Sequence, residues 1–226
     1  MLHLNQKSDW RKKKFRLLLH NLSFTSNISD FDLEKFSGDF NLSKDGVSIK
    51  DMTLKTTRTS LALSAELEHF NIFAPFNKAA FRDAPFKISF NADKFDFGDL
   101  ETFVPEVDML HGKIKGDIEL SGQIKRFAVK KLVLQVGETK LETIGSIEKL
   151  DTPSEMLIHA RFSNSRIFAN DVADLLPDVT IPQIVGYEEI VVDSLSYDGT
   201  PLKFISKAKL LAVSYTHLTL PTIYSV

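Results

Sequence analysis

Cysteine is absent from this chain of 226 residues, so neither disulfide bonds nor thiolate metal sites are available to it. This absence fits a reducing cytoplasm and a periplasm equally well. Long apolar runs are also missing: the longest, Phe15–Leu19, is interrupted by Arg16 and is too short to span a membrane. The formal net charge of −2 provides no basic footprint for nucleic acid, which we therefore exclude as a partner.

Motifs for catalysis and metal binding are missing as well. The chain has no Gly-x-Ser-x-Gly, its six histidines form no His-x-x-x-His pair, and it has no Asp-x-Asp-x-Asp-Gly loop. Asp117 and Glu119 share a strand face with Lys113 and Lys115, which is typical of a solvated mixed-charge surface. We therefore expect a protein that is not an enzyme, with no metal and no cofactor.

Tyrosine and tryptophan are scarce, whereas phenylalanine is abundant. The chain has 18 Phe, 4 Tyr and one Trp. Tyrosine and tryptophan suit surfaces that meet both water and a polar partner, so their scarcity disfavours a sugar-binding face. Phenylalanine in strands suits either a dry core closed by its own side chains or an environment of acyl chains, and composition does not separate these two.

Alternation of apolar and polar residues dominates the chain and predicts strands with one dry and one wet face. About ten to twelve strands can be drawn, with turns at Lys44–Gly46, Gly137-Glu138 and Asp198-Gly199. The expected fold class is all-β: an elongated, curved antiparallel sheet of meandering hairpins, a half-pipe or β-taco, with two short helices. The residues expected to share one continuous apolar face are Leu61, Leu63, Leu67, Phe86, Ile88, Phe90, Ile114, Ile118, Leu120, Leu132, Leu134 and Val136.

A nine-residue segment occurs twice. Asp99–Val107 aligns without a gap on Asp171–Val179, at an offset of 171 − 99 = 72 residues. In each copy, apolar residues at i, i+3 and i+4 share one helical face, and a proline ends the helix. We predict short helices at about 98–104 and 170–176. The duplication favours an elongated β array; two similar caps within one globular β domain are the alternative.

The ends of the chain differ from its body, which spans 15–212 and divides into units at roughly 15–107 and 108–212. Residues 1–14 form a charged lead-in to the first strand. Residues 213–226 begin with ten residues that resemble a translated frame of a transposon adapter used in sequencing libraries. We expect this tail to be non-native and poorly packed; a genuine edge strand is the alternative.

Three segments together resemble the AsmA-like superfamily, and within it the TamB-type translocation and assembly proteins. They are Leu54–Leu63, the run Asp96–Pro105 and the strand region Leu110–Gly122. The shared motifs are a helix pattern Asp-Leu-x-x-Phe-x-Pro and a strand pattern Gly-x-Ile-x-Leu-x-Gly. The similar stretch covers roughly residues 15–212, about the whole chain except its tail.

The resemblance implies a periplasmic protein that is tethered to the inner membrane by an anchor outside this sequence. Its curled sheet would carry phospholipid between the inner and outer membranes along an apolar groove. The implied partners are phospholipid acyl chains, an outer-membrane barrel of the BamA/TamA type and neighbouring β repeats of the same chain.

The shared apolar face supplies a compatible mechanism. Its twelve residues are the candidates for lining a lipid groove, because burying each CH₂ of an acyl chain contributes roughly 0.8 kcal/mol without a directional contact. The alternative function is a structural β array that assists outer-membrane protein assembly by strand augmentation. An envelope enzyme of β-sandwich type comes last, for want of any site.

Overall fold

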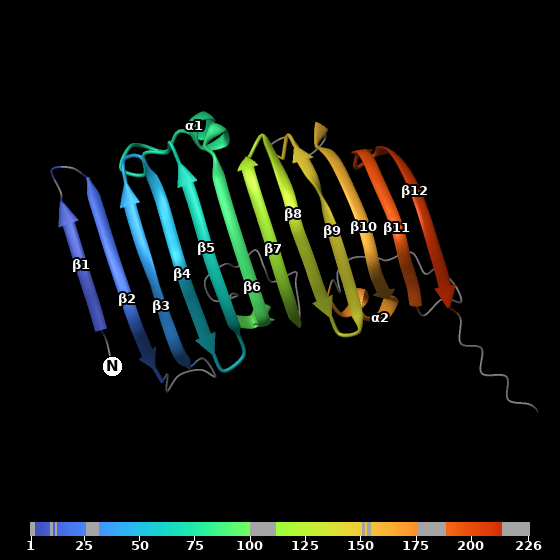
Figure 1. The fold of residues 1–226 in the computed structure, drawn as a ribbon, viewed down its shortest axis with the longest axis horizontal. Helices are drawn as coiled ribbons and strands as arrows, with labels where there is room; N and C mark the ends of the chain where they lie inside the picture. The colour runs from blue at the N-terminus through green and yellow to red at the C-terminus, as the bar shows by residue number, and fades with distance from the viewer. Residues whose placement is uncertain are drawn as a thin grey trace, which may run out of the picture.

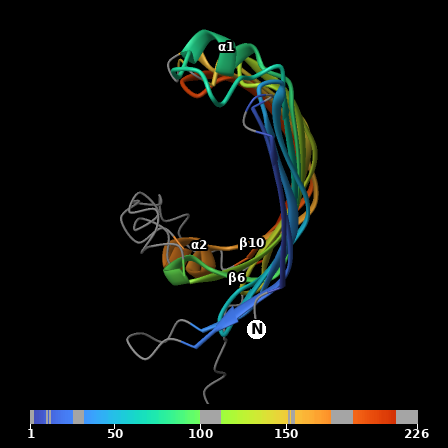
Figure 2. The ribbon, with the colours of Figure 1, turned by 90° about the vertical axis from the view of Figure 1, so that its left-hand side faces the viewer.

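The computed structural model describes residues 3–9, 11, 13–25, 32–99, 112–150, 152, 155–175 and 189–213. Within these ranges, twelve strands form one open sheet in which every strand pairs antiparallel with its neighbours in the chain (Figure 1). Viewed along the row of strands, the sheet bends into a C shape (Figure 2). The predicted fold class, a curved antiparallel sheet with short helices, is confirmed.

The strands and helices follow one another along the chain without a crossover. The strands are β1 (His3–Asp9), β2 (Lys14–Phe24), β3 (Leu33–Ser43), β4 (Gly46–Thr56), β5 (Ser60–Glu68), β6 (Phe86–Asp96), β7 (Lys113–Gln123), β8 (Arg126–Val136), β9 (Thr139–Glu148), β10 (Leu157–Phe168), β11 (Glu189–Thr200) and β12 (Lys203–Val213). The helices are α1 (Lys78–Asp83), the 3₁₀ turn η1 (Phe97–Asp99) and α2 (Ala169–Leu175).

Bulges near the middle of the strands give the sheet its curvature. The pairing register shifts between Ile49 and Met52 in β4 and between Ser163 and Arg166 in β10. At these two shifts, Asp51 and Asn164 have positive φ angles of 50° and 46°. A bulge bends the strand that contains it and increases the local twist, so a row of bulges across neighbouring strands curls the whole sheet.

The sheet contains a four-strand unit that occurs twice, as β3–β6 with η1 and as β7–β10 with α2. The register shift of β4 at Ile49 and Met52 recurs in β8 at Val129 and Leu132, at an offset of 129 − 49 = 80 residues. The duplicated nine-residue segment seen in the sequence is therefore the end of a longer repeat, whose described parts span 33–99 and 113–175.

One insertion hides this repeat from a gapless comparison. Its first three strands are 80 residues apart, whereas its last strand and helix are 72 apart, so 80 − 72 = 8 residues are extra in the first copy. The extra residues lie in the connection 69–85, which carries α1, while the equivalent connection 149–156 joins β9 to β10 without an α-helix among its described residues.

Two glycines occupy equivalent positions in the hairpins β7–β8 and β11–β12. Gly122 and Gly199 have φ angles of 141° and 143°, and a Cβ on either would lie 2.6 Å from a backbone Cα, that of Phe127 or Phe204 respectively. Both positions therefore need glycine so that the next strand can approach closely. The expected turn at Asp198-Gly199 is wrong: Gly199 belongs to β11, pairs with Phe204, and the turn lies at 201–202.

The predicted helix at 170–176 is confirmed as α2, displaced by one residue. Of its predicted counterpart, only η1 and the residues up to Asp99 lie within the described part of the chain. Helix α1 has no periodic signal in the sequence, because six residues are too few. Its start is set by the Asn77 side chain, which accepts a hydrogen bond from the Ala80 amide at 3.0 Å.

The two predicted end segments meet the sheet differently. The charged lead-in contains β1, which pairs with β2 from His3 to Asp9. At the other end, β12 finishes at Val213, and the rest of the predicted non-native tail lies outside the described residues. The sheet therefore begins and ends with an edge strand, β1 and β12.

Candidate functional site

The twelve residues expected to share an apolar face lie on one face of the sheet. Leu63, Phe90, Ile118 and Leu132 stand opposite one another in the consecutive strands β5 to β8. The other eight occupy alternate positions along the same four strands and so point the same way: Leu61, Leu67, Phe86, Ile88, Ile114, Leu120, Leu134 and Val136. That these residues hold lipid remains a prediction.

This apolar face is the inner, concave one. The helical turn that follows β6 and helix α2 both lie inside the curve of the sheet (Figure 2). Phe97 in that turn packs against the cluster formed by Leu61, Ala92 and Phe95, and its ring lies edge-on to Phe95 with centroids 5.3 Å apart. The residues below the turn therefore face inward, and the curve of the sheet gathers their side chains together.

The inner face is only partly buried. Leu61 is 8% exposed, whereas the other eleven of the twelve side chains are of intermediate exposure. A single-layer sheet that closed a core of its own would bury its large apolar side chains almost completely. Partial exposure along four neighbouring strands instead describes a concave apolar strip, which we call the inner strip.

The outer face is polar and carries ion pairs, both between neighbouring strands and within one strand. The Arg16 guanidinium donates hydrogen bonds to Asp39 and holds the pKa of that carboxyl below its usual range. Lys140 lowers the pKa of Glu142 in the same way, and Lys131 binds Asp117. Pairs exposed in this way contribute little to stability but keep the convex surface wetted.

A row of three outer residues has the order of a catalytic triad without its geometry. Ser146, His159 and Asp198 stand opposite one another in β9, β10 and β11, beside a hollow of about 590 Å³. The His159 Nδ1 lies 2.9 Å from an Asp198 oxygen. Within the described residues, however, Ser146 shows no hydrogen bond to His159, and proton transfer from a serine nucleophile requires that bond.

The ends of the strands form the two rims of the curve. We call the rim that carries α1 the α1 lip and the opposite rim the α2 lip (Figure 1). Because every strand reverses direction, the connections that follow odd-numbered strands lie at the α1 lip, and those that follow even-numbered strands lie at the α2 lip.

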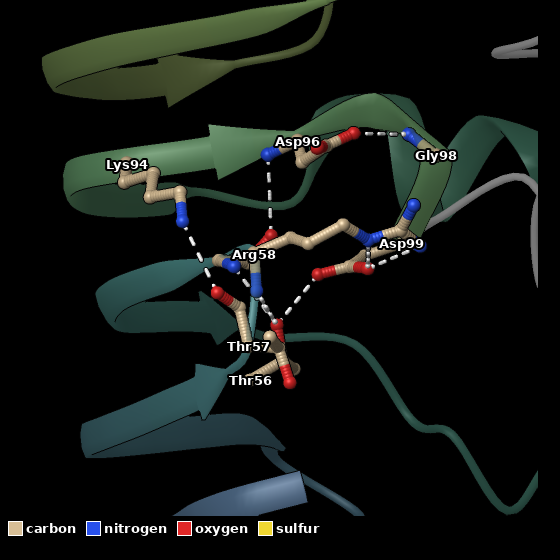
Figure 3. Close-up of polar contacts among 8 residues, drawn as sticks. Thr56, Thr57, Arg58, Lys94, Asp96, Gly98 and Asp99 are labelled. Atoms are coloured by element: carbon tan, nitrogen blue, oxygen red, sulfur yellow. Dashed lines mark hydrogen bonds and ion pairs between the residues drawn. The ribbon is translucent and has the colours of Figure 1, made fainter. Parts of the chain in front are cut away.

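At the α2 lip, an aspartate holds the β4–β5 hairpin through a set of contacts that we call a clasp (Figure 3). Asp99, only 6% exposed, accepts hydrogen bonds from the Thr56 hydroxyl at 2.6 Å and from Arg58 Nε at 2.8 Å. The backbone amide of Asp96 donates to the hydroxyl of Thr59 at 3.2 Å. The end of β6 is thereby tied to the hairpin that precedes it.

The second unit repeats this clasp with different donors. Asp171, 72 residues after Asp99, accepts hydrogen bonds from the backbone amides of Glu138 and Thr139 at 2.9 and 2.7 Å. The amide of Phe168 donates to the Thr139 hydroxyl at 2.9 Å, just as the equivalent Asp96 amide donates to Thr59. Both clasps fix a helical turn against the inner side of the α2 lip.

The α1 lip is a ribbon of turns joined by backbone hydrogen bonds. The His69 amide donates to Asp45 at 2.7 Å, the Lys125 amide to Arg82 at 3.4 Å and the Lys149 amide to Lys125 at 2.8 Å. Consecutive turns are two strands apart, which corresponds to roughly 10 Å. The lip therefore presents its side chains at regular intervals along the groove.

The two lips carry opposite charge. The described turns of the α1 lip contain seven cations, Arg11, Lys13, Lys44, Lys78, Arg82, Lys125 and Lys149, against the anions Asp45, Asp83 and Glu155. The described turns and helices of the α2 lip contain the cation Arg58 against Asp32, Asp99, Glu138, Asp171 and Asp174. An electrostatic gradient therefore crosses the mouth of the curve, from a basic rim to an acidic one.

In the described part of the chain, no three His, Asp or Glu side chains are grouped so that they could hold a metal ion. Over the same residues, no helix combines the length and apolar character that crossing a membrane requires. Comparison with known proteins gives no match to a protein-family model, a curated protein or a solved structure.

The clasps and the charged lips were not found from the sequence alone. The pairing of Thr59 with Thr139 follows from the 80-residue offset, a signal that was present in the sequence but interrupted by the insertion at 69–85. Taken one at a time, the lysines of the α1 lip look like ordinary turn residues. Their common position becomes visible only when strand order places every second turn at the same rim.

Proposed function

We propose that this chain is a segment of a periplasmic protein of the AsmA-like, TamB-type class, whose inner strip carries phospholipid between the inner and outer membranes. The observation that carries the proposal is the inner strip itself: large apolar side chains, partly exposed, on the concave side of an open curved sheet. Soluble proteins seldom leave a continuous apolar surface of this kind without a ligand or partner.

The dimensions of the strip suit an acyl chain. It crosses the four strands β5 to β8, so its length is set by the spacing of about 4.8 Å between neighbours and is roughly 15 Å from the first strand to the last. Attraction between CH₂ groups and this floor is proportional to area and has no preferred direction. A lipid tail can therefore slide along the strip, because no specific site holds it in one place.

A second function is supported by the edges of the sheet. Phe204, Ile205, Leu210 and Leu211 of β12 are exposed, and one side of this strand has no neighbour in the described sheet. An apolar edge strand is a template for an added strand. This observation favours the alternative in which the sheet assists outer-membrane protein assembly by augmentation.

Photo-crosslinking tests the lipid proposal directly. A photoreactive benzoyl-phenylalanine at Ile118 would lie on the inner strip, and one at Gln135 on the outer face. After irradiation of the protein in a periplasmic extract, mass spectrometry should find phospholipid attached at position 118 and not at 135. Equal yields at the two positions would contradict a lipid role for the strip.

A charge variant tests the same floor without a label. Ile118→Glu with Leu134→Glu places two carboxylates on the inner strip, where they lack partners. The matched control, Ser121→Glu with Gln135→Glu, places them on the outer face of the same two strands. We expect the inner double variant to remain folded, as judged by circular dichroism, and to lose lipid binding. The outer double variant should remain folded and still bind lipid. Unfolding of the inner pair alone would show a closed core instead of a groove.

A further inference from the structure

The α1 lip combines cations with exposed apolar side chains. Phe73, Phe76, Leu150 and Leu202 all lie in its turns, with exposures of 38, 70, 45 and 89%. The seven cations of the lip lie in the same series of turns. Apolar and cationic groups side by side match a phospholipid where its acyl chains meet its phosphate, and they do not match water or a purely apolar ligand.

The aromatic part of the lip is held in place by its own packing. Phe81 of α1 contacts the buried Phe70 with ring centroids 5.4 Å apart, and Phe76 packs on Phe81 at 5.6 Å. The Gln123 side chain donates to the Asp83 carbonyl at 2.6 Å, which fixes the end of α1 to β7. Phe76 is therefore presented to solvent by a supported cluster, and α1 leans over the inner side of the sheet (Figure 2).

The insertion that builds this cluster is not needed to connect strands. The equivalent connection of the second unit, 149–156, makes the same passage from one strand to the next without the eight extra residues. Two cations of the lip, Lys44 and Lys78, form no ion pair with another described residue. Lys125 and Lys149 pair with Asp83 and Glu155 at 3.0 Å, in contacts that are exposed to water.

We propose that the α1 lip binds the phosphate of phospholipids whose acyl chains lie on the inner strip. This assignment rests on the proposed function and adds the substrate class and its orientation. Lysine ammonium groups bind phosphate as point charges, and the acidic α2 lip repels it. Every bound lipid therefore lies with its phosphate toward the α1 lip, its ester region against the exposed apolar side chains, and its tails on the floor.

The test compares two lipids that differ only in the headgroup: fluorescent phosphatidylglycerol and the diacylglycerol with the same chains. The wild-type chain should bind phosphatidylglycerol about tenfold more tightly, because each lysine beside an anionic headgroup contributes several-fold. Raising the salt concentration to about 0.5 M should reduce this preference, since exposed charges are screened. Equal binding of the two lipids at low salt would overturn the assignment while leaving the groove intact.

Charge reversal locates the preference on the lip. Lys44→Glu, Lys78→Glu and Lys125→Glu together should abolish the preference for phosphatidylglycerol and leave diacylglycerol binding unchanged. The control reverses Lys115, Lys130 and Lys207, which are exposed lysines of the strands, with the same change in net charge. An unchanged preference in the lip variant, or an equal loss in the control, would overturn the assignment.

Two further outcomes separate the lip from the groove. If neither lipid binds to the wild-type chain, the proposed function itself fails, and the lip assignment fails with it. If inorganic phosphate alone binds as tightly as phosphatidylglycerol in a phosphorus NMR titration, the lip recognises free phosphate and the lipid assignment is overturned.

Discussion

β3–β6 and β7–β10 follow one plan, yet they differ in how tightly each unit is built. In the first unit, Asp99 binds its hairpin turn through the side chains of Thr56 and Arg58; in the second, Asp171 binds backbone amides. The buried apolar cluster around Leu61 also belongs to the first unit. The comparison shows that the position of the aspartate is what repeats, while its donors differ between the copies.

The inner-face residues of the two units also differ, and again the first unit is the better packed. Leu63 and Ala65 of β5 correspond, at the 80-residue offset, to Thr143 and Gly145 of β9. At β9, the second unit therefore has less apolar area on its inner face and less packing between its own strands. On this comparison, the first unit is the more stable part of the sheet.

The largest difference is expected at equivalent leucines. Leu61→Ala removes a nearly buried side chain from the core cluster and should lower the free energy of unfolding by about 3 kcal/mol. Leu141→Ala, its counterpart in β9, removes a side chain that is only partly buried and should cost about 1 kcal/mol. Urea denaturation followed by circular dichroism measures both. Equal losses would show that the two units are packed alike.

The clasps should differ by less. Asp99→Ala leaves the buried Thr56 hydroxyl and Arg58 without their acceptor and should cost about 2 kcal/mol, whereas Asp171→Ala should cost about 1 kcal/mol. Hydrogen exchange distinguishes the two sites: only Asp171→Ala should speed exchange of the Glu138 and Thr139 amides. Faster exchange of these amides in Asp99→Ala would mean that the clasps act together.

The smallest expected effect is on the pH dependence of stability. Arg16 holds the pKa of Asp39 below its ordinary value, so the carboxylate is favoured in the folded state. The resulting stability is present above the ordinary pKa of an aspartate, near 4, and is lost as the pH falls through the lowered value. Asp39→Asn should therefore lower the urea midpoint slightly at pH 7 and have no effect at about pH 2. Glu142→Gln in the second unit should behave in the same way, and a midpoint shift that persists in acid would contradict the ion-pair explanation.

Alternation was enough to predict which residues share a face, because the side chains of a strand have a period of two and the hairpins are short. Ile118 and Leu132 are examples, since the structure places them directly opposite one another. Bulges could not be predicted in this way. Aspartate is a common turn residue, yet Asp51 occupies a bulge inside β4. Gly199 is the converse case, because its positive φ serves a close approach of strands and not a turn.

The candidate site likewise has one part that the sequence predicts and one part that it does not. Its floor follows from local pattern, so the sequence predicts it residue by residue. The lips depend on which turns meet at one rim, and this is a property of the strand order that no single turn reveals; Lys44 and Lys149, more than a hundred residues apart in the chain, are an example. The insertion at 69–85 also concealed the repeat that would have aligned the two clasps.

Every strand pairs only with its immediate neighbours in the chain. This unbroken strand order also affects how the chain can fold during its synthesis. Each new hairpin finds its docking edge already formed by the residues synthesised just before it, so no strand waits for a distant partner and loop-closure entropy stays low. Folding can proceed from the amino terminus while the chain is still emerging from a ribosome or a secretion channel. During that growth the newest strand is always the reactive edge, and the moment of greatest risk of aggregation moves along the chain with it.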